Sequence, residues 1–343
     1  MTVVHHFGPD PNQAGGISTV IGLLVEHDIG ADSVRHHTTW RPHSHLANLV
    51  RLVRCSLTLL RIPRRQIVHI HLSEKGSFVR EGWLLILARR RNLITVATLH
   101  GASFGQFAEK APRLVAEVLR RADLVTCLDR EAIELVRRSA PLVHAEILPN
   151  PVWIADRAVP ADETGELVVF AGEIGLRKGA DILVSAWRQL AERHPQARCL
   201  MIGPVADYLP PATHRLEVRE PVDRAEIADV LDSARVIALP ARAEAMPMIL
   251  AEAMSHGRPF VSTAVGGVPE LASAGGILVP VDDDVGLADR LSEFLSSPDL
   301  AREVGERGRA FCIKTRSIRI IDERLGRLYA IATSAHSTRG AAK

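Results

Sequence analysis

Residues 238–271 read ALPARAEAMPMILAEAMSHGRPFVSTAVGGVPEL, and the fold that we expect depends on this stretch. Residues 235–240 (RVIALP) form a short apolar run typical of a buried parallel strand, which ends at a proline because proline donates no ladder hydrogen bond. Pro247 suits the first turn of a helix, and His256-Gly257 is a typical helix end. Residues 259–263 form the next expected strand. This strand-helix-strand order predicts an α/β sheet.

Two glutamates of this stretch fall where a ligand would bind. Glu244 lies in the loop at the carboxyl end of the strand, and Glu252 lies about two turns into the helix on roughly the same side. Ligands of open α/β sheets bind at the carboxyl ends of the strands, and the N–H groups of a helix start attract anions. A nucleotide would place its phosphates on those N–H groups and its ribose hydroxyls on a carboxylate. Considered alone, two such glutamates are more often charges on a helix surface.

The stretch resembles the signature of the retaining family-4 glycosyltransferases, with Glu244 and Glu252 at the family's pair of glutamates. The resemblance implies an α/β protein of the GT-B fold, in which two Rossmann-like parallel-sheet domains face an interdomain cleft. It also implies a nucleotide-sugar donor. The further matching positions are Pro240, Arg242, Met248, Ala253, Gly257, Pro259, Gly266-Gly267 and Pro269-Glu270.

The donor site implied by this resemblance lies mostly in the second half of the chain. Lys178, in the loop AGEIGLRKG, stands at the family's Lys-Gly, which binds the donor diphosphate. Without the resemblance, a lysine in a loop is most often a solvated surface charge. Glu244 would hold the sugar, Glu252 the ribose, and main-chain groups near Arg219 the base. The other residues expected to contact the donor are Gly15, Gly16, Arg242, Ala245, Met246, Pro247 and Met248.

One position departs from the family pattern. The family commonly has arginine six residues before Gly179, and this chain has Glu173. A carboxylate beside two phosphates would repel them in a low-dielectric site. We therefore expect Glu173 to point away or to be offset by Arg177 or Arg242.

The first half of the chain contributes a glycine loop and a histidine. Residues 2–7 predict a strand, and Gly15-Gly16 opens the predicted helix 17–26, where backbone N–H groups can approach a phosphate closely. Residues 93–99 predict a strand that ends at His100, whose pKa we expect near neutrality. The resemblance places His100 at the transferred sugar. Alone, a glycine pair is more often a turn, and a single histidine is more often structural.

We expect neither a metal nor a cofactor other than the donor substrate. His69 and His71 have no carboxylate or cysteine at ligand spacing, which argues against zinc, and the family needs no divalent metal. The triple acid at residues 282–284 precedes a predicted helix and fits a cap. The widely spaced cysteines are expected to be reduced and in or near the core. They are Cys55, Cys127, Cys199 and Cys312.

Residues 46–61 predict an amphipathic basic helix that ends before Pro63. Two interpretations remain open: the arginines form the solvated face of an ordinary packing helix, or they bind an anionic membrane surface, where each contributes ~1 kcal/mol. The sequence HLSEKGSFVR at residues 71–80 is similar to family members that build exopolysaccharides or capsules, which implies a glycan or lipid-linked acceptor. The residues expected on one apolar face are Leu46, Leu49, Val50, Val53, Leu57 and Leu60. The candidate membrane-binding residues are Arg51, Arg54, Arg61 and Arg65.

The length of 343 residues suffices for two domains. We expect an acceptor-binding domain over residues 1–158, a donor-binding domain over 159–316, a terminal helix over 317–332 that packs back on the first domain, and a flexible tail over 333–343. The sequence ILPNP before Trp153 resembles the family's crossover between domains, although Pro151 stands where the family usually has glycine. Residues 1–158 carry an excess of six basic residues, which favours an acidic or phosphorylated partner for the first domain.

Composition is that of a globular protein, with 47% hydrophobic and 24% charged residues. No apolar run approaches the ~18–20 residues that span a bilayer, and the N-terminus lacks the features of a signal peptide. We expect a cytoplasmic location, with the inner face of the membrane as the place of a peripheral contact. Nucleic acid is not an expected partner.

Together these features predict a retaining, metal-independent transfer of a hexose to a glycan or lipid-linked acceptor, in bacterial polysaccharide or glycolipid synthesis. Lys178, Glu244 and His100 are the candidate catalytic residues. Lys178 and Arg242 would stabilise the negative charge of the departing diphosphate, and His100 would partly stabilise the positive charge of the oxocarbenium ion. The resemblance implies no covalent nucleophile. Two alternatives are a GT-B epimerase or phosphorylase and, because of Glu173, a non-catalytic nucleotide-binding scaffold.

Overall fold

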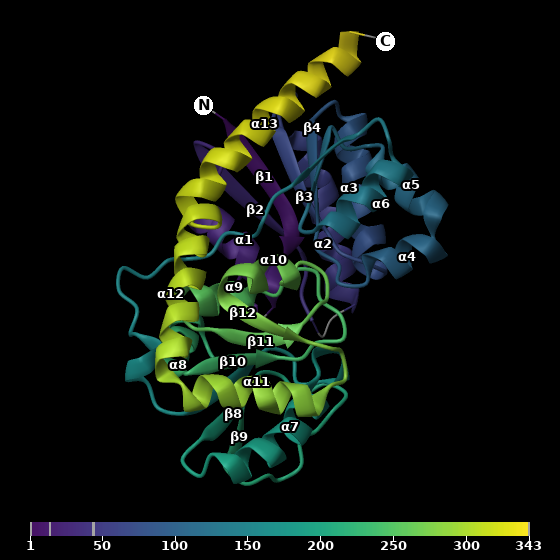
Figure 1. Ribbon diagram of the computed structural model, residues 1–343. Coiled ribbons are helices and arrows are strands. Elements are labelled where there is room, and N and C mark those ends of the chain that lie inside the picture. Colours follow the sequence, from purple (N-terminus) through teal and green to yellow (C-terminus); the bar gives the residue numbers. More distant parts are fainter. Residues whose placement is uncertain (1, 14, 43–44, 342–343) are drawn as a thin grey trace. The chain divides into compact units, whose positions relative to one another are not determined.

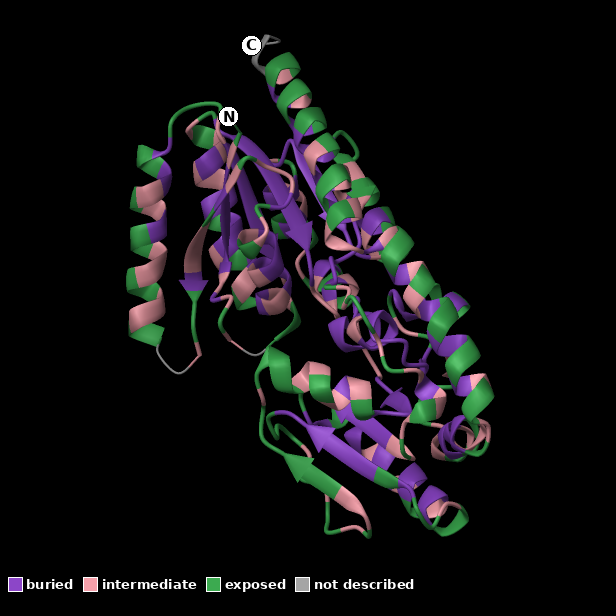
Figure 2. Cartoon of the chain, turned by 90° about the vertical axis from the view of Figure 1, so that its left-hand side faces the viewer, coloured by how far each residue is buried: buried purple, intermediate pink, exposed green. Residues whose placement is uncertain are grey.

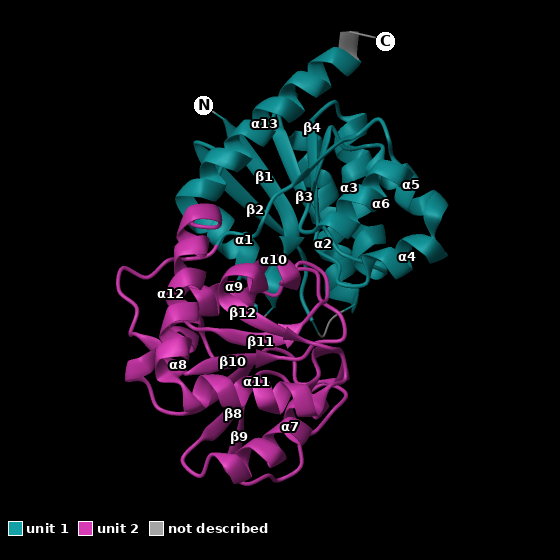
Figure 3. Cartoon of the chain, in the orientation of Figure 1, with its two compact units in different colours: residues 1–151, 318–343 teal, residues 152–317 magenta. Residues whose placement is uncertain are grey.

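The computed structural model describes residues 2–13, 15–42 and 45–341, and it divides into two compact units (Figures 1 and 3). Unit 1 consists of Met1–Pro151 and Ile318–Lys343, and unit 2 of Val152–Ser317. The division lies at Pro151 rather than at residue 158, because the Val152 N–H donates to the carbonyl of Arg316, 2.9 Å away, and so ties Val152 to the end of unit 2.

Unit 1 is built on a parallel sheet of six strands in the order β2-β1-β3-β4-β5-β6. β3 and β4 are buried along their whole length, which explains their continuous apolar character. The chain turns from one half of the sheet to the other between β1 and β3, so the loops after these strands flank the switch point where ligands bind in open sheets. The strands are β1 Val3–Pro9, β2 Ser33–Trp40, β3 Ile67–Leu72, β4 Ile94–Leu99, β5 Leu124–Cys127 and β6 His144–Ile147.

Helices cover this sheet, and their apolar residues complete a core around Phe7, Ile70 and Phe78. The expected strand at residues 2–7 and helix at 17–26 are present as β1 and α1, although Ala14 of the loop between them lies outside the described residues. The helices of unit 1 are α1 Gly16–Glu26, α2 His45–Arg61, α3 Gly76–Arg90, α4 Phe104–Lys110, α5 Pro112–Leu119, α6 Arg130–Ser139 and α13 Ile318–Ala341.

The last helix, α13, returns to unit 1 and packs against β4 and β5. Its residues Leu325 and Tyr329 are buried. The expectation of a flexible tail from residue 333 is wrong up to Ala341, because the helix continues to that residue. A side chain of this part also contacts the body of unit 1, since His336 Nδ1 lies 3.0 Å from Asp123 Oδ2. Residues 342 and 343 lie outside the described part of the chain.

α2 is present over the expected residues but is oriented differently from an ordinary packing helix. Cys55 and Leu59 face the core of unit 1. The six apolar residues expected on one face are all exposed. The packing face is therefore the opposite one. Arg54 and Arg61 are exposed, as a solvated face requires, and contact of the arginines with a membrane stays a prediction.

Unit 2 repeats the architecture with a second parallel sheet, in the order β12-β11-β10-β7-β8-β9. The strand-helix-strand unit expected from residues 235–263 is present as β10-α9-β11, with Pro247 as the N-cap of α9 rather than in its first turn. The triple acid acts partly as expected, because Asp283 caps α11 by accepting the N–H of Gly286. The four cysteines are buried and unpaired. The strands are β7 Leu167–Ala171, β8 Arg198–Ile202, β9 Leu216–Arg219, β10 Val236–Leu239, β11 Phe260–Thr263 and β12 Gly276–Val279. The helices are η1 Ala161–Glu163, η2 Leu176–Lys178, α7 Ala180–Arg193, α8 Arg224–Ser233, α9 Met248–Ser255, α10 Val268–Gly275, α11 Asp284–Ser296 and α12 Pro298–Thr315.

Candidate functional site

The strand order of unit 2 places one switch point between β7 and β10. The chain runs outward from β7 through β8 to β9, and then from β10 through β11 to β12 in the opposite direction. The connections after β7 and β10 lead to opposite halves of the sheet. Open α/β sheets bind their ligands beside the carboxyl ends of the strands at such a switch point. The loop after β7 contains Lys178, and the loop after β10 contains Glu244.

These two loops meet through a salt bridge. Lys178 Nζ lies 2.9 Å from Glu244 Oε1, and Arg177 Nη1 lies 3.1 Å from the same oxygen. The Lys178 and Glu244 side chains are only 15% and 10% exposed, so the pair is largely withdrawn from water but still accessible from one side. Two of the sequence-predicted residues, 66 positions apart, are thus in direct contact. A cation held in this way can exchange its carboxylate partner for the oxygens of a phosphate.

Glycines allow the loops to approach each other closely. Gly179 has a φ of 71°, and a Cβ atom there would lie 2.0 Å from the carbonyl oxygen of Pro240. Gly266 has a φ of 51°, and a Cβ there would lie 2.0 Å from the carbonyl oxygen of Glu244. The Gly267 N–H donates to the carbonyl of Ala245 at 2.6 Å. The glycines that the sequence places at turns therefore hold the backbone on which Glu244 stands.

Glu173 is offset, as expected, by a neighbouring arginine. Arg177 Nη2 lies 3.3 Å from Glu173 Oε1, while Nη1 of the same guanidinium reaches Glu244. Arg177 also donates to the carbonyl of Ala243 at 3.2 Å. One guanidinium thus neutralises the unusual acid and holds the loop after β10.

Arg242 is committed to other partners than a phosphate. Its Nη1 lies 2.8 Å from Asp181 Oδ1, and its Nη2 lies 2.8 Å from Asp181 Oδ2. Its Nε lies 2.7 Å from Asp282 Oδ1. These contacts raise the pKa of the guanidinium and lower that of Asp181. Arg242 also donates to the carbonyl of Leu176. The geometry therefore gives Arg242 a structural contact across the site, and its expected contact with the donor stays a prediction.

Glu252 lies on α9 and is half-buried. Burial raises the pKa of its carboxyl, and the positive charge of Arg224 opposes this shift. Within the described residues, no hydrogen bond or ion pair of the Glu252 side chain is found. Such a carboxylate has free lone pairs for the hydroxyl donors of a ligand.

The remaining donor-side residues differ in accessibility. Ala245, Met246, Pro247 and Met248 are buried, so only their main-chain groups at the start of α9 are suited to a ligand. Arg219 lies at the end of β9, pairs with Glu217 at 2.6 Å and lines a hollow of about 440 Å³. This hollow shares no lining residue with the Lys178–Glu244 cluster. The expected contact between the base and the main chain near Arg219 is therefore a prediction without support from the cluster.

In unit 1, His100 belongs to a buried chain of hydrogen bonds. His100 Nε2 lies 2.9 Å from His71 Nδ1, and His71 Nε2 lies 2.9 Å from His6 Nδ1. His6 Nε2 is 3.2 Å from the hydroxyl of Tyr329, which is 2.8 Å from His69 Nδ1. Burial lowers the pKa of His100 to about 3, so the expectation of a pKa near neutrality is wrong. His100 is neutral at physiological pH, and its orientation depends on this chain.

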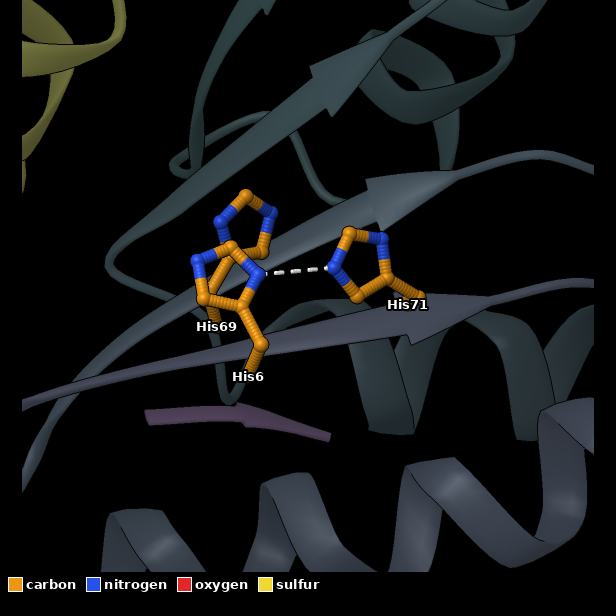
Figure 4. Close-up of side chains that lie close together, drawn as sticks. All are labelled: His6, His69 and His71. Atoms are coloured by element: carbon orange, nitrogen blue, oxygen red, sulfur yellow. Dashed lines mark hydrogen bonds between the residues drawn. The ribbon is translucent and has the colours of Figure 1, made fainter. Parts of the chain in front are cut away.

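Three of these histidines could also hold a metal ion. His6, on β1, and His69 and His71, on β3, offer nitrogen atoms within 4.8 Å of one another, and Figure 4 shows their rings gathered together. The parallel register sets His6 beside His69. The spacing of residues around His69 and His71 was therefore no argument against zinc, because the third imidazole, that of His6, comes from another strand. Every ring nitrogen of the three already has a hydrogen-bond partner, which satisfies the cluster without a metal.

Gly15 and Gly16 lie at the start of α1, after β1. Both are exposed, Gly15 has a φ of 141°, and a Cβ at Gly15 would meet no atom within 4 Å. The backbone at the start of α1 is therefore open, as a phosphate-binding loop requires.

Comparisons with known proteins identify the second unit. Residues 165–297 match the family described as Glycosyl transferases group 1. Unit 2 is a group 1 glycosyl transferase domain. The family resemblance seen at Glu244 and Glu252 is thus confirmed, and the matched residues of the group 1 domain include Lys178, Glu244 and Glu252.

Similarity to curated relatives extends beyond the group 1 domain. The D-inositol 3-phosphate glycosyltransferase of Xylanimonas cellulosilytica is 31% identical over 273 residues, which are 67% of this chain and 63% of the relative. The enzyme of the same name from Streptomyces scabiei is 28% identical over 70% of this chain and 62% of the relative. The chain thus spans less than two thirds of the length of these relatives.

Solved structures match both units. Sucrose-phosphate synthase from Thermosynechococcus elongatus has a TM-score of 0.77 at 20% identity, over 98% of this chain and 100% of that chain. Anabaena Alr3699/HepE in complex with UDP-glucose has a TM-score of 0.76 at 15% identity, over 96% of this chain and 100% of that one. At such identities the likeness establishes the fold, which is the expected GT-B fold with two Rossmann-like sheets.

Several residues of these clusters were not predicted from the sequence. Asp181 and Asp282 bind Arg242, while His6 and Tyr329 complete the histidine chain. The alternation of His69 and His71 along one strand was a usable signal, because residues two apart share a face. No local pattern pointed to Tyr329, which lies 323 positions from His6.

Proposed function

We propose that this protein is a retaining glycosyltransferase that moves a hexose from a nucleoside-diphosphate sugar to a glycan or lipid-linked acceptor. The observation that supports it most is the contact between Lys178 and Glu244 at the switch point of a group 1 domain. Lys178 is the group of this cluster best placed to neutralise a pyrophosphate, and Glu244 is the one best placed to accept hydrogen bonds from the sugar hydroxyls. The curated relatives are named as glycosyltransferases of an inositol phosphate, which supports the reaction class.

The donor would be bound mainly by unit 2. A diphosphate would compete with Glu244 for Lys178 and Arg177, and the released carboxylate would turn to the sugar hydroxyls. Glu252 would accept the ribose hydroxyls. As the leaving group departs, its negative charge increases, so the same cations stabilise the transition state more than the ground state. UDP-glucose is the first donor to test, because Anabaena Alr3699/HepE was solved with it.

We assign the acceptor and the sugar-facing histidine to unit 1. His100 is neutral and lies at the carboxyl end of β4, beside a small cavity of about 20 Å³ that Asn150 also lines. A neutral imidazole can form a hydrogen bond with a hydroxyl without adding positive charge beside an oxocarbenium ion. The exposed start of α1 at Gly15 and Gly16 would offer N–H groups to the diphosphate or to an acidic acceptor.

Retention and metal independence are parts of this proposal with tests of their own. Lys178 and Arg177 supply the positive charge that a divalent cation provides in other transferases, so we expect activity to persist in EDTA. Retention predicts a product with the anomeric configuration of the donor, measured by NMR of the isolated glycoside. Loss of activity in EDTA or an inverted anomer would contradict the respective part.

A thermal-shift panel of nucleoside diphosphates and nucleotide sugars tests the donor site. Binding raises the free energy of unfolding by RT ln(1 + [L]/Kd) and so raises the melting temperature, and Lys178→Ala is expected to remove this shift. Lys314→Ala, an exposed lysine of α12 in the same unit, is the matched control and should keep it. An unchanged shift in Lys178→Ala would refute the phosphate role.

Two other functions would give different results in the same assays. An epimerase or phosphorylase of this fold would convert the donor without dependence on an acceptor, whereas a non-catalytic scaffold would bind nucleotide weakly and convert nothing. The offset of Glu173 by Arg177 removes the repulsion that suggested the scaffold.

We further propose that the protein acts in the cytoplasm and makes peripheral contact with the inner membrane face, as part of bacterial polysaccharide or glycolipid synthesis. Arg54, Arg61 and Arg65 would contribute to this contact. In the described part of the chain, no helix is both long and apolar enough to cross a bilayer.

A further inference from the structure

The surface in question is the exposed side of α2. Its residues Leu46, Leu49, Val50, Val53, Leu57 and Leu60, here called the α2 apolar face, are between 45% and 76% exposed. At about 100° per residue they lie within one sector of roughly 100°, opposite the buried Cys55 and Leu59. In Figure 2, α2 is the helix at the left edge, and most of its surface is exposed or intermediate. Isolated apolar residues are common on protein surfaces, but six aliphatic side chains in one exposed stripe indicate an interaction surface.

Two residues of α3 extend this apolar surface. Val79 and Trp83 are 56% and 47% exposed. The indole N–H of Trp83 points to Ser56 Oγ of α2, at 3.4 Å. Trp83 therefore borders the α2 apolar face on the side of Ser56. A tryptophan with an apolar ring and one polar atom suits the boundary between hydrocarbon and water.

Arginines border the other side. Arg54 and Arg61 lie about 70–90° from the centre of the α2 apolar face on the helix, and both are exposed. Arg64 and Arg65 follow the helix and are exposed as well. Arg51 is further round, and its Nη1 donates to Asn48 Oδ1 at 2.9 Å, so it is less suited to an external partner.

The charge of the whole segment is of one sign. From Ser33 to Ser73 the chain contains seven arginines and no aspartate or glutamate. A second copy of this surface would bring arginines against arginines with no acid to neutralise them. An anionic phospholipid surface instead offers phosphates to the arginines and acyl chains to the aliphatic residues.

We propose that the α2 apolar face inserts into the interfacial layer of an anionic membrane, with Trp83 on one side of it and Arg54, Arg61, Arg64 and Arg65 on the lipid phosphates. This deepens the peripheral location proposed above and names the inserting residues. The helix lies in the plane of the surface rather than across the bilayer. The contact needs no donor, so it can be tested separately from glycosyl transfer.

Sedimentation of the full chain with vesicles measures this binding. We expect it to bind vesicles of phosphatidylcholine mixed with phosphatidylglycerol, to bind pure phosphatidylcholine far less, and to be released by high salt. Leu49→Asp/Val53→Asp should abolish binding, because charges would enter the apolar layer. Leu142→Asp is the matched control, since Leu142 is an even more exposed leucine of unit 1 outside this surface, and it should bind as the unchanged protein does.

A pair of charge variants separates the arginine contacts from net charge. Arg54→Gln/Arg61→Gln should weaken vesicle binding by about fivefold for each arginine removed, or roughly 25-fold together. Arg113→Gln/Arg130→Gln removes the same charge from exposed positions elsewhere in unit 1 and should change the binding little. Equal losses in both pairs would overturn the assignment to the α2 border.

Insertion has its own optical signature. Brominated acyl chains should quench tryptophan fluorescence of the bound protein, and Trp83→Phe should remove most of that quenching while the other three tryptophans remain. Vesicle binding that survives Leu49→Asp/Val53→Asp would overturn the proposal. So would lipid-independent self-association that this double change abolishes, because the face would then belong to a second copy. Variants that lose vesicle binding but keep the nucleotide-dependent thermal shift leave the donor-site proposal intact.

Discussion

Glu244 and Glu252 are the same residue type eight positions apart, but their carboxylates have different surroundings. Glu244 Oε1 receives both Lys178 and Arg177, so its charge is neutralised before any ligand arrives. The Glu252 carboxylate has no hydrogen bond within the described residues, and burial raises its pKa. The carboxylate of Glu244 is therefore positioned by two cations, whereas the carboxylate of Glu252 is a hydrogen-bond acceptor without a donor.

Replacing Glu252 should improve stability and reduce binding. A raised pKa means that the folded state holds a costly charge above that pKa, and this cost disappears as the pH falls below the pKa of an unfolded glutamate. Glu252→Gln removes the cost, so we expect a higher free energy of unfolding at pH 7 in urea denaturation. It also removes charge-assisted bonds to ribose, so nucleotide affinity by calorimetry should fall about tenfold or more. Glu192→Gln, on the exposed side of α7, should change neither quantity.

The elements of unit 2 hold the site through backbone contacts that only glycine permits. The turn after β11 lies against the loop after β10, and a Cβ atom at Gly266 would lie 2.0 Å from the carbonyl oxygen of Glu244. Any side chain there would push against the carbonyl of Glu244 and disturb the loop that contains the carboxylate. The stability of the site thus depends on an element that touches no ligand.

Gly266→Ala tests this dependence. The positive φ and the Cβ position 2.0 Å from the Glu244 carbonyl oxygen both disfavour alanine, and we expect unfolding to become easier by about 1–3 kcal/mol. The nucleotide-dependent thermal shift should shrink as well. Gly165→Ala is the control, because a Cβ at Gly165 meets no atom within 4 Å and its φ is not positive. A Gly266→Ala variant as stable as Gly165→Ala would contradict this account.

At the scale of the whole molecule, the two units differ in their buried histidines. Unit 1 encloses His6, His69, His71 and His100 in neutral form, and burial lowers the pKa of His69 and of His100 to about 3. An unfolded histidine binds its proton near pH 6.5. The stability that these residues contribute is therefore present above that pH, and it is lost as the pH falls from about 6.5 towards 3.

Unit 1 should consequently open before unit 2 in mild acid. Hydrogen exchange between pH 7 and pH 5, corrected for the intrinsic exchange rate, should show β1, β3 and β4 losing protection first. The strands of unit 2, which lack such a histidine cluster in the described chain, should keep theirs. Equal losses in both units, or an earlier loss in unit 2, would show that the histidine chain does not govern acid stability.

Several features of the molecule were predictable from local patterns. The β10-α9-β11 unit, the two α/β halves and the position of Lys178 before a helix follow from apolar spacing, glycine turns and a recognisable signature. These signals act over a few residues, so a sequence can be read for them. The acceptor and the donor sugar are not determined by such patterns, and they remain part of the proposed function.

The sequence by itself determined which residues of α2 share an apolar face and which residues open each candidate loop, because helix and strand periodicity are properties of neighbouring residues. Only the tertiary structure decided that this face points outward, that Arg242 binds Asp181 and Asp282, and that His100 is buried, neutral and bonded to His71. The reason is that exposure, pKa and pairing depend on what packs against a side chain, and those partners come from distant parts of the chain.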